Sequence, residues 1–169
     1  MQLNKEYTFR TALPGDTMQL VELGLDAYGQ FKNALTDDNW QIMQTNLKNE
    51  NTYITLLQNA KGYVCEHSGK IVGMAFLVPE GNPTTIFEAG WAYIRMVGVA
   101  PGYEGQGIAK KLTSMCMDHA VQTNEKVIAL HTSEMMDAAR HIYEQLGFKR
   151  QRELAPIFGK KYWLYLLQL

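Results

Sequence analysis

The sequence lacks a surplus of charge of either sign, because 16 lysines and arginines stand against 17 aspartates and glutamates. A net charge of −1 gives the chain no overall basic footprint for nucleic acid or an anionic membrane. Long hydrophobic runs are also missing, since the longest mostly apolar stretch, residues 71–79, is too short to cross a bilayer. The first residues lack the apolar core of a signal peptide, so we expect a cytoplasmic protein.

Cysteine is scarce, and the two thiols, Cys65 and Cys116, lie far apart in the sequence. Cys65 falls in a strand-like run and Cys116 on the apolar face of a predicted helix, so we expect buried free thiols. None of the four histidines stands at metal-ligand spacing from either cysteine. The sequence therefore predicts no metal site.

The two common nucleotide-binding loops are absent as well. Gly105 and Gly107 are not followed by Lys-Ser or Lys-Thr, as a P-loop would require. Lys110 stands where a Gly-x-Gly-x-x-Gly loop would have its third glycine. Any phosphate site in this chain must therefore be of another kind.

What the chain has instead is a strand, a tight turn and a helix start between residues 96 and 112. Val97 and Val99 are β-branched at period two, and Pro101 follows them as a strand breaker. Gly105 and Gly107 then open a helix, whose unpaired N–H groups and partial positive charge suit a phosphate. Glycines also leave room for a bulky pyrophosphate. The pattern predicts an anion cradle, with a simple tight connection as the alternative.

Length and composition are those of one globular domain with a single core: 169 residues, 46% hydrophobic and 20% charged. The patterns predict strands over residues 7–12, 62–67, 71–78, 91–99, 126–131, 148–152 and 162–167. Helices are predicted from Asp16 to about 28, from 36–38 onward, from 107 to about 122, and from 132–133 to 147. The order is β-α-α-β-β-β-α-β-α-β-β, a mixed α/β layer fold in which strands 91–99 and 126–131 run parallel.

Caps and turns fix several of these boundaries. We expect Asp16 to cap the first helix, and Thr36 with its two aspartates the second, with Trp40 among the inward residues. Thr132 or Ser133 is expected to cap the last helix, with Glu134 in its first turn, and Gly147 ends that helix. Ser68-Gly69 predicts a hairpin.

Three pieces of the sequence resemble the GNAT superfamily of acyl-coenzyme A-dependent N-acyltransferases. Residues 9–16 are similar to its opening strand and turn, 97–112 to its coenzyme-binding motif, and 143–148 to its closing helix and strand. The three pieces follow the family's order and spacing over nearly the whole chain. Residues 94–99 and 130–133 are further similar to a bacterial-type subgroup.

The resemblance implies one N-acetyltransferase domain, residues 1–169, with a GNAT fold: a mixed sheet of about six to seven strands and helices on both faces. It implies acetyl transfer from acetyl-coenzyme A, as co-substrate, to a small-molecule or peptide primary amine that attacks the thioester directly. No metal, nucleic acid or membrane is implied, and family members are often homodimers. A non-catalytic acyl-coenzyme A binding or sensing module on the same fold is the alternative.

Carried over residue by residue, the coenzyme site falls on strand, loop and last helix: Val97, Gly98, Val99, Gly105, Gln106, Gly107, Ile108, Ala109, Lys110, Met136 and Ala139. In the family this strand splays from the next, and Gly98 suits a bulge or a close backbone approach. Two residues depart from the pattern. Glu104 replaces the usual Gln or Arg and would repel a pyrophosphate, and Met136 replaces an Asn found in many members.

The resemblance makes Tyr143 the candidate general acid, one residue off the apolar stripe of its helix, and a tyrosine hydroxyl suits protonation of a thiolate. The general base stays open between Glu88, Glu80, Tyr93 and water. Aromatic residues could wall an acceptor pocket or pack in the core: Tyr28, Phe31, Trp40, Trp91 and Tyr93. The acceptor itself stays open, from small amines and polyamines to amino acids and proteins.

Overall fold

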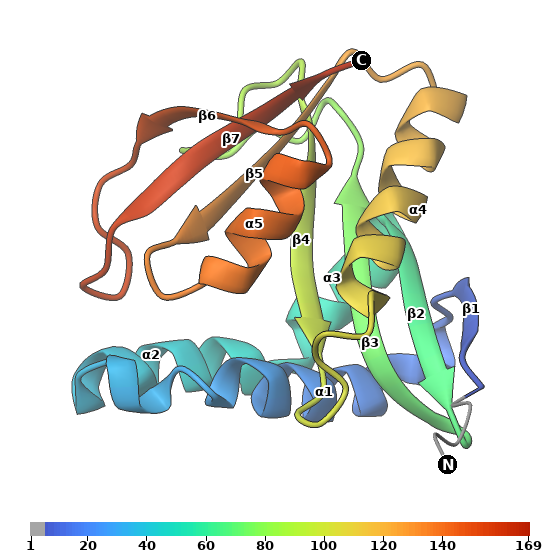
Figure 1. Cartoon of the computed structure of the whole chain (residues 1–169), viewed down its shortest axis with the longest axis vertical. Helices are drawn as coiled ribbons and strands as arrows, with labels where there is room; N and C mark the ends of the chain where they lie inside the picture. Colours follow the sequence, from blue (N-terminus) through green and yellow to red (C-terminus); the bar gives the residue numbers. More distant parts are fainter. Residues whose placement is uncertain (1–5) are drawn as a thin grey trace.

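The computed structural model describes residues 6–169 and places seven strands in one sheet, in the order β1-β2-β3-β4-β5-β7-β6 (Figure 1). The strands are β1 Thr8–Thr11, β2 Lys61–His67, β3 Lys70–Val78, β4 Ala92–Val99, β5 Val127–Ser133, β6 Lys149–Glu153 and β7 Tyr162–Gln168. The helices are α1 Thr17–Gly29, α2 Asp37–Lys48, α3 Glu50–Asn59, α4 Ile108–Gln122 and α5 Asp137–Gln145, with short 3₁₀ turns at Pro14–Asp16 and Lys32–Ala34. Residues 1–5, which enter the expectation about a signal peptide, lie outside the described residues.

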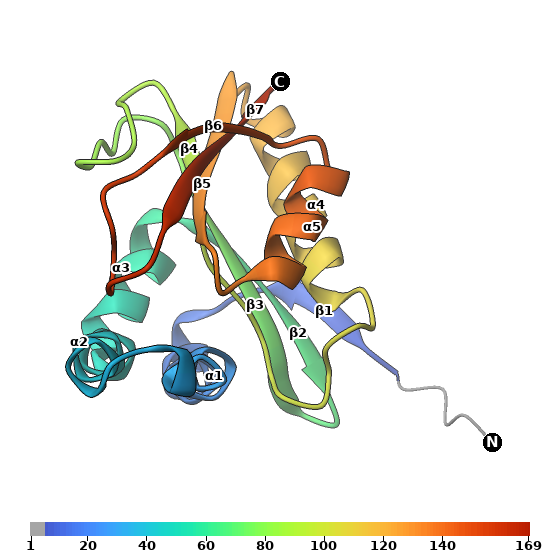
Figure 2. The same cartoon turned by 60° about the vertical axis from the view of Figure 1, so that its left-hand side comes forward.

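The helices cover both faces of the sheet, as predicted. Helices α4 and α5 lie on one face, and α1, α2 and α3 lie on the other (Figure 2). Every neighbouring pair of strands is antiparallel except β4 and β5, which are parallel and are joined by α4. The mixed α/β class is therefore confirmed, and the one parallel crossover stands in the middle of the sheet.

One helix is missing from the predicted order. Helix α3 follows α2 after a single residue, Asn49, whose side chain accepts a hydrogen bond from the N–H of Asn51 (3.0 Å). Its buried face consists of Tyr53 and Leu56. The element was missed because neither glycine nor proline separates it from α2 and its apolar pattern is short.

Other local predictions are confirmed. The Thr36 hydroxyl accepts from the N–H of Asn39 (3.2 Å) at the start of α2, whose inner face buries Trp40, Met43 and Leu47. Ser68 and Gly69, at φ +51° and +76°, form the hairpin between β2 and β3. Both cysteines are free and buried.

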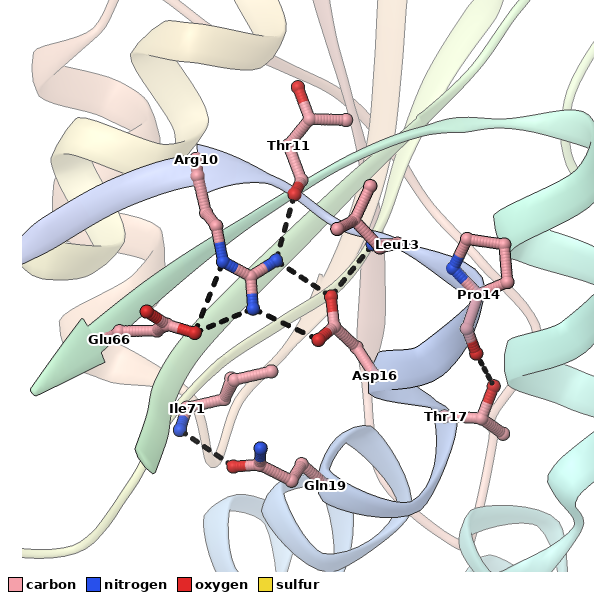
Figure 3. Close-up of polar contacts among 9 residues, drawn as sticks. All are labelled: Arg10, Thr11, Leu13, Pro14, Asp16, Thr17, Gln19, Glu66 and Ile71. Carbon is pink, nitrogen blue, oxygen red and sulfur yellow. Dashed lines mark hydrogen bonds and ion pairs between the residues drawn. The ribbon is translucent and has the colours of Figure 1, made fainter. Parts of the chain in front are cut away.

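The carboxylate of Asp16 does not cap α1, contrary to the prediction. It turns back to the preceding strand, where it accepts from the N–H of Leu13 (2.7 Å) and pairs with the Arg10 guanidinium (2.8 and 2.9 Å) (Figure 3). Arg10 also bridges to Glu66 on β2 (2.6 Å). This pairing lowers the pKa of the Asp16 carboxyl. Because a charged partner offers a stronger hydrogen bond than a helix N–H, Asp16 links β1, β2 and α1 instead of capping α1.

The start of the last helix also differs from the prediction. Thr132 and Ser133 belong to β5, where Ser133 pairs with Tyr162 of β7, and α5 begins only at Asp137. Hydroxyl residues favour both caps and strands, and here the pairing with β7 decides between them. Gly147, at φ +99°, follows the end of α5 as predicted.

Candidate active site

The central parallel strands separate along their length, and we call this split between β4 and β5 the cleft. Strands β4 and β5 pair only at Ala92 with Ile128 and at Tyr93 with Ala129. Beyond these pairs the two strands diverge toward their carboxyl ends (Figure 1). Unpaired backbone groups in the middle of a sheet can accept an extended ligand as an added strand. The divergence is what the GNAT resemblance implies.

A β-bulge in β4 accounts for the divergence. The register against β3 runs from Met74 opposite Gly98 to Phe76 opposite Arg95, so Met96 and Val97 both stand against a single residue. Met96 has φ +57°, a left-handed conformation that costs a side-chain-bearing residue about 1–2 kcal/mol. A bulge bends and twists its strand, so it adds to the separation of β4 from β5 that begins after Tyr93.

Of the two roles that the sequence left open for Gly98, a bulge or a close approach, the structure does not place the bulge there. The bulge lies at the two preceding positions, while Gly98 is buried against α1. A Cβ there would lie 3.2 Å from the Cβ of Ala27 and 3.5 Å from the Cε of Met74. The close approach expected at Gly98 is therefore made by helix α1.

The glycine turn before α4 leaves open the space that the predicted cradle needs. Gly105 and Gly107 have φ of +71° and +80°, and a Cβ at either would meet nothing within 4 Å. The first helical bond runs from the N–H of Lys111 to the carbonyl of Gly107 (3.0 Å). The N–H groups of Ile108, Ala109 and Lys110 thus have no acceptor within the helix. Open space beside these donors fits an anionic group such as a pyrophosphate.

Neighbouring side chains hold the cradle in place. Ile108 is 2% exposed, and its side chain packs close against Gly73 of β3. The Tyr7 hydroxyl donates to the Gln106 amide oxygen, and Tyr7, His67 and Tyr103 pack their rings together beside it. The loop is thus tied both to the core and to the first strand.

Glu104 lies exposed at the entrance to this cradle. Its carboxylate accepts a hydrogen bond from the N–H of Gly102 (2.7 Å), so it turns back onto its own turn. Glu104 directly precedes Gly105 of the cradle, and a carboxylate repels an anion at short range. We therefore expect it to weaken binding of coenzyme A.

Replacing Glu104 by Gln should tighten coenzyme A binding about two- to fivefold, because it removes an exposed like charge worth about 0.5–1 kcal/mol. Glutamine keeps an acceptor for the N–H of Gly102, so the turn should persist. Calorimetric titration with coenzyme A at low and high salt measures the effect, and the gain should shrink at high salt. Weaker binding by the variant would show that Glu104 supports the site.

Tyr143 and Tyr28 approach the cleft from opposite faces of the sheet. Tyr28, on α1, donates its hydroxyl to the carbonyl oxygen of Val97 (3.3 Å). Tyr143 is the buried residue of α5, at 7% exposure, although the sequence placed it one residue off the buried stripe. Burial raises the pKa of the Tyr143 hydroxyl well above its usual range, and Tyr28 raises it further. Tyr143 therefore keeps its proton at neutral pH.

Met136 and Ala139 lie at the start of α5, partly buried. The Met136 sulfur accepts a weak hydrogen bond from the Thr132 hydroxyl of β5 (3.7 Å). This contact joins the first turn of α5 to the diverging end of β5. Apart from this sulfur, the Met136 side chain offers only apolar atoms, and its contact with a pantetheine stays a prediction.

The other predicted site residues are not brought together. Glu88 is exposed in the loop before β4 and lines a groove of about 420 Å³ with Trp91 and Arg152. It thus lies toward the amino end of β4, where β4 and β5 are still paired, so its role as base stays a prediction. Tyr93 stacks on Phe87 (4.3 Å between ring centroids) and donates to the carbonyl of Asn82 (3.0 Å). The predicted aromatic wall is not assembled either. Trp91 lines the groove with Glu88, Trp40 is buried on α2, and Tyr28 contacts Val97.

Two residues near the cleft were missed by sequence reasoning. His131 of β5 lies between the rings of Phe87 and Tyr162, and its Nδ1 atom is buried without a partner among residues 6–169. Burial, and then the charge of Arg95, lowers the pKa of His131 to about 4, so the ring is neutral at pH 7. Arg95 is exposed on β4. The signal available in the sequence was their position, because Arg95 and His131 lie in the segments 94–99 and 130–133 that resemble the family.

Membrane-spanning helices and metal-binding clusters are both absent from residues 6–169. No helix in residues 6–169 has the length and apolarity needed to span a membrane. Over the same residues, no cluster of three or more His, Cys, Asp or Glu side chains could hold a metal ion.

Comparison with known proteins agrees with this geometry. The chain is 40% identical over 62 residues to N-alpha-acetyltransferase 30 of Schizosaccharomyces pombe, covering 37% of this chain and 41% of that protein. It is 29% identical over 114 residues to the probable N-acetyltransferase camello of Xenopus tropicalis, covering 67% and 49%. The chain thus spans about half the length of these curated relatives or less.

The same fold occurs in the PaiA N-acetyltransferase of Thermoplasma acidophilum, solved in complex with coenzyme A. The TM-score is 0.79 at 10% identity, over 97% of this chain and 99% of that one. The family model of the acetyltransferase (GNAT) family matches residues 26–148, well over half of the sequence. With its splayed central strands and glycine cradle, the chain belongs to the acetyltransferase (GNAT) family.

Proposed function

We propose that this protein transfers an acetyl group from acetyl-coenzyme A to a primary amine. The observation that carries the proposal is the position of the cleft. The bulge at Met96 bends β4 away from β5. Pro101 follows shortly after the end of β4, and the glycine cradle begins at Gly105. Strand β4 therefore leads from a site for the extended pantetheine of coenzyme A to a site for its pyrophosphate.

The described residues fit coenzyme A. The N–H groups of Ile108, Ala109 and Lys110 would bind the pyrophosphate over the open side of Gly105 and Gly107. The diverging edge of β4, at Val97, Gly98 and Val99, would pair with the pantetheine as an added strand. Met136 and Ala139 would supply apolar contact on the α5 side.

Acetyl-coenzyme A, when bound, supplies a thioester carbonyl as the acyl donor. The amine nitrogen forms a bond to the carbonyl carbon while the carbon–sulfur bond breaks, and the nitrogen releases its proton to water. A backbone N–H of β4 would stabilise the negative charge that develops on the carbonyl oxygen. Tyr143 would donate its hydroxyl proton to the departing thiolate and regain one from solvent. Its raised pKa keeps that proton available.

A non-catalytic acyl-coenzyme A module is the second candidate, and it is not favoured. Tyr143 offers a protonated hydroxyl beside the cleft, and the matching relatives carry the names of N-acetyltransferases. A cytoplasmic location and a homodimer stay predictions from the sequence and the resemblance.

Thiol release from acetyl-coenzyme A, measured with a panel of primary amines, tests the proposal. We expect amine-dependent release together with a stoichiometric amount of acetylated amine, identified by mass spectrometry. Binding of coenzyme A in calorimetry, with no release above hydrolysis for any amine, would favour the binding module.

A further inference from the structure

A second groove opens beside the cleft, on the face of the sheet that carries α2 and α3. It has a volume of about 520 Å³ and reaches from α3 across β4 to Met96, the bulged residue. Arg95 precedes the bulge and also lines this groove. The groove therefore ends at the point where β4 leaves β5, which is where the proposed reaction takes place.

The wall of this groove is polar but almost uncharged. Seven residues with amide or hydroxyl side chains line it: Asn46, Asn51, Thr52, Thr55, Asn59, Asn82 and Tyr93. Arg95 is the one lining residue that is charged at neutral pH, and no aspartate or glutamate accompanies it there. A cationic polyamine or lysine-rich peptide is disfavoured there, because the charge of Arg95 repels it and no carboxylate among the lining residues offsets that repulsion.

Arg95 has no anionic partner of its own. Across residues 6–169 the arginines in ion pairs are Arg10 and Arg140, and Arg95 is in none of them. Its charge reaches Tyr28 of α1 and His131 of β5, on either side of the cleft. Arg95 is exposed beside the bulge and among neutral polar groups. Its guanidinium is therefore suited to bind a carboxylate through two parallel hydrogen bonds, in a bidentate pair.

We infer that the acceptor is a small primary amine that also carries a carboxylate, and that Arg95 binds this carboxylate. The inference rests on the proposed acetyltransferase function, because it names the substrate class of the same cleft. The carboxylate would lie in the groove while the amine points past Met96 toward the thioester. Arg95 thereby determines specificity, through orientation of the amine.

Matched amine pairs test this inference. The wild-type protein is assayed with glycine, β-alanine, 4-aminobutyrate and 6-aminohexanoate, each beside its carboxamide, and with a diamine of similar length. We expect kcat/KM for the best carboxylate to exceed that of its carboxamide about tenfold or more, the value of one charge-assisted hydrogen bond. The length of the best spacer reports the distance from Arg95 to the amine.

Variants of Arg95 then identify the cause. In Arg95→Gln the carboxylate preference should fall to about twofold or less, mainly through KM, and Arg95→Lys should keep part of it because a point charge remains. Arg152→Gln is the matched control, since it removes an exposed arginine from the groove that holds Glu88. It should keep the full preference.

The outcomes separate this inference from the proposed function. Equal turnover of carboxylates and carboxamides, or an unchanged preference in Arg95→Gln, overturns the inference while the acetyltransferase function stands. If no amine is acetylated, the proposed function fails, and calorimetry of the same carboxylates in the presence of coenzyme A tests the groove directly. Carboxylate binding lost in Arg95→Gln but kept in Arg152→Gln then supports the site, and no binding overturns it.

Discussion

Replacing Tyr143 by Phe should lower kcat about 100-fold or more while leaving coenzyme A affinity nearly unchanged. The substitution keeps the buried ring and its packing against Phe148, and removes the hydroxyl proton of Tyr143. General acid catalysis contributes about 10²–10⁴-fold in typical enzymes. Steady-state kinetics with a saturating amine, together with calorimetric titration of coenzyme A, measures both quantities.

Tyr53→Phe provides the matched control. Tyr53 is likewise buried, but its hydroxyl lies against Gly24 of α1 without a partner in the described chain. This variant should turn over at the wild-type rate. Wild-type kcat in Tyr143→Phe would reduce Tyr143 to a packing residue, and the thiolate would then leave unaided or be protonated by water.

Gly107→Val should weaken coenzyme A binding about tenfold or more. The new side chain would occupy the open space beside the N–H groups of α4, and loss of a single charge-assisted hydrogen bond costs about 1.5–3 kcal/mol. Gly107 has φ +80°, so valine also strains the backbone there. Affinity is therefore read by calorimetry together with the melting temperature.

A glycine elsewhere separates the two effects of that substitution. Gly81 has φ +90°, open space around it, and a place in the loop after β3. Gly81→Val should lower the melting temperature similarly and leave coenzyme A affinity intact. If Gly107→Val folds and binds coenzyme A like the wild type, the cradle does not hold the pyrophosphate.

Much of the fold could be predicted because its signals are local. The Ser68-Gly69 turn, the Thr36 cap and the glycines before α4 each act within a few residues. Where a distant partner decided the outcome, prediction failed. Asp16 bonds to Arg10 rather than to α1, and Ser133 joins β7 rather than capping α5.

The candidate site divides along the same line. The cradle is one continuous segment and could be predicted from its glycines. The bulge at Met96 could not, because it depends on the register against β3, and no residue type at that position announces a positive φ. Arg95 and His131 lie 36 positions apart in the sequence, and they influence each other only because the fold brings β4 and β5 together. Sequence reasoning therefore predicted a coenzyme site but no acceptor site.

The two-pair junction between β4 and β5 has a consequence for aggregation. A sheet normally exposes unpaired strand edges only at its two ends, and proteins protect those edges against pairing with other chains. This sheet has two further edges in its interior, created where the strands part, and α1 and α5 are the elements that conceal them. Any condition that loosens α5 would expose these edges from the face of the sheet that α5 covers. Bound coenzyme A would then also limit aggregation, because its pantetheine would occupy the open strand edge at which other protein molecules could pair.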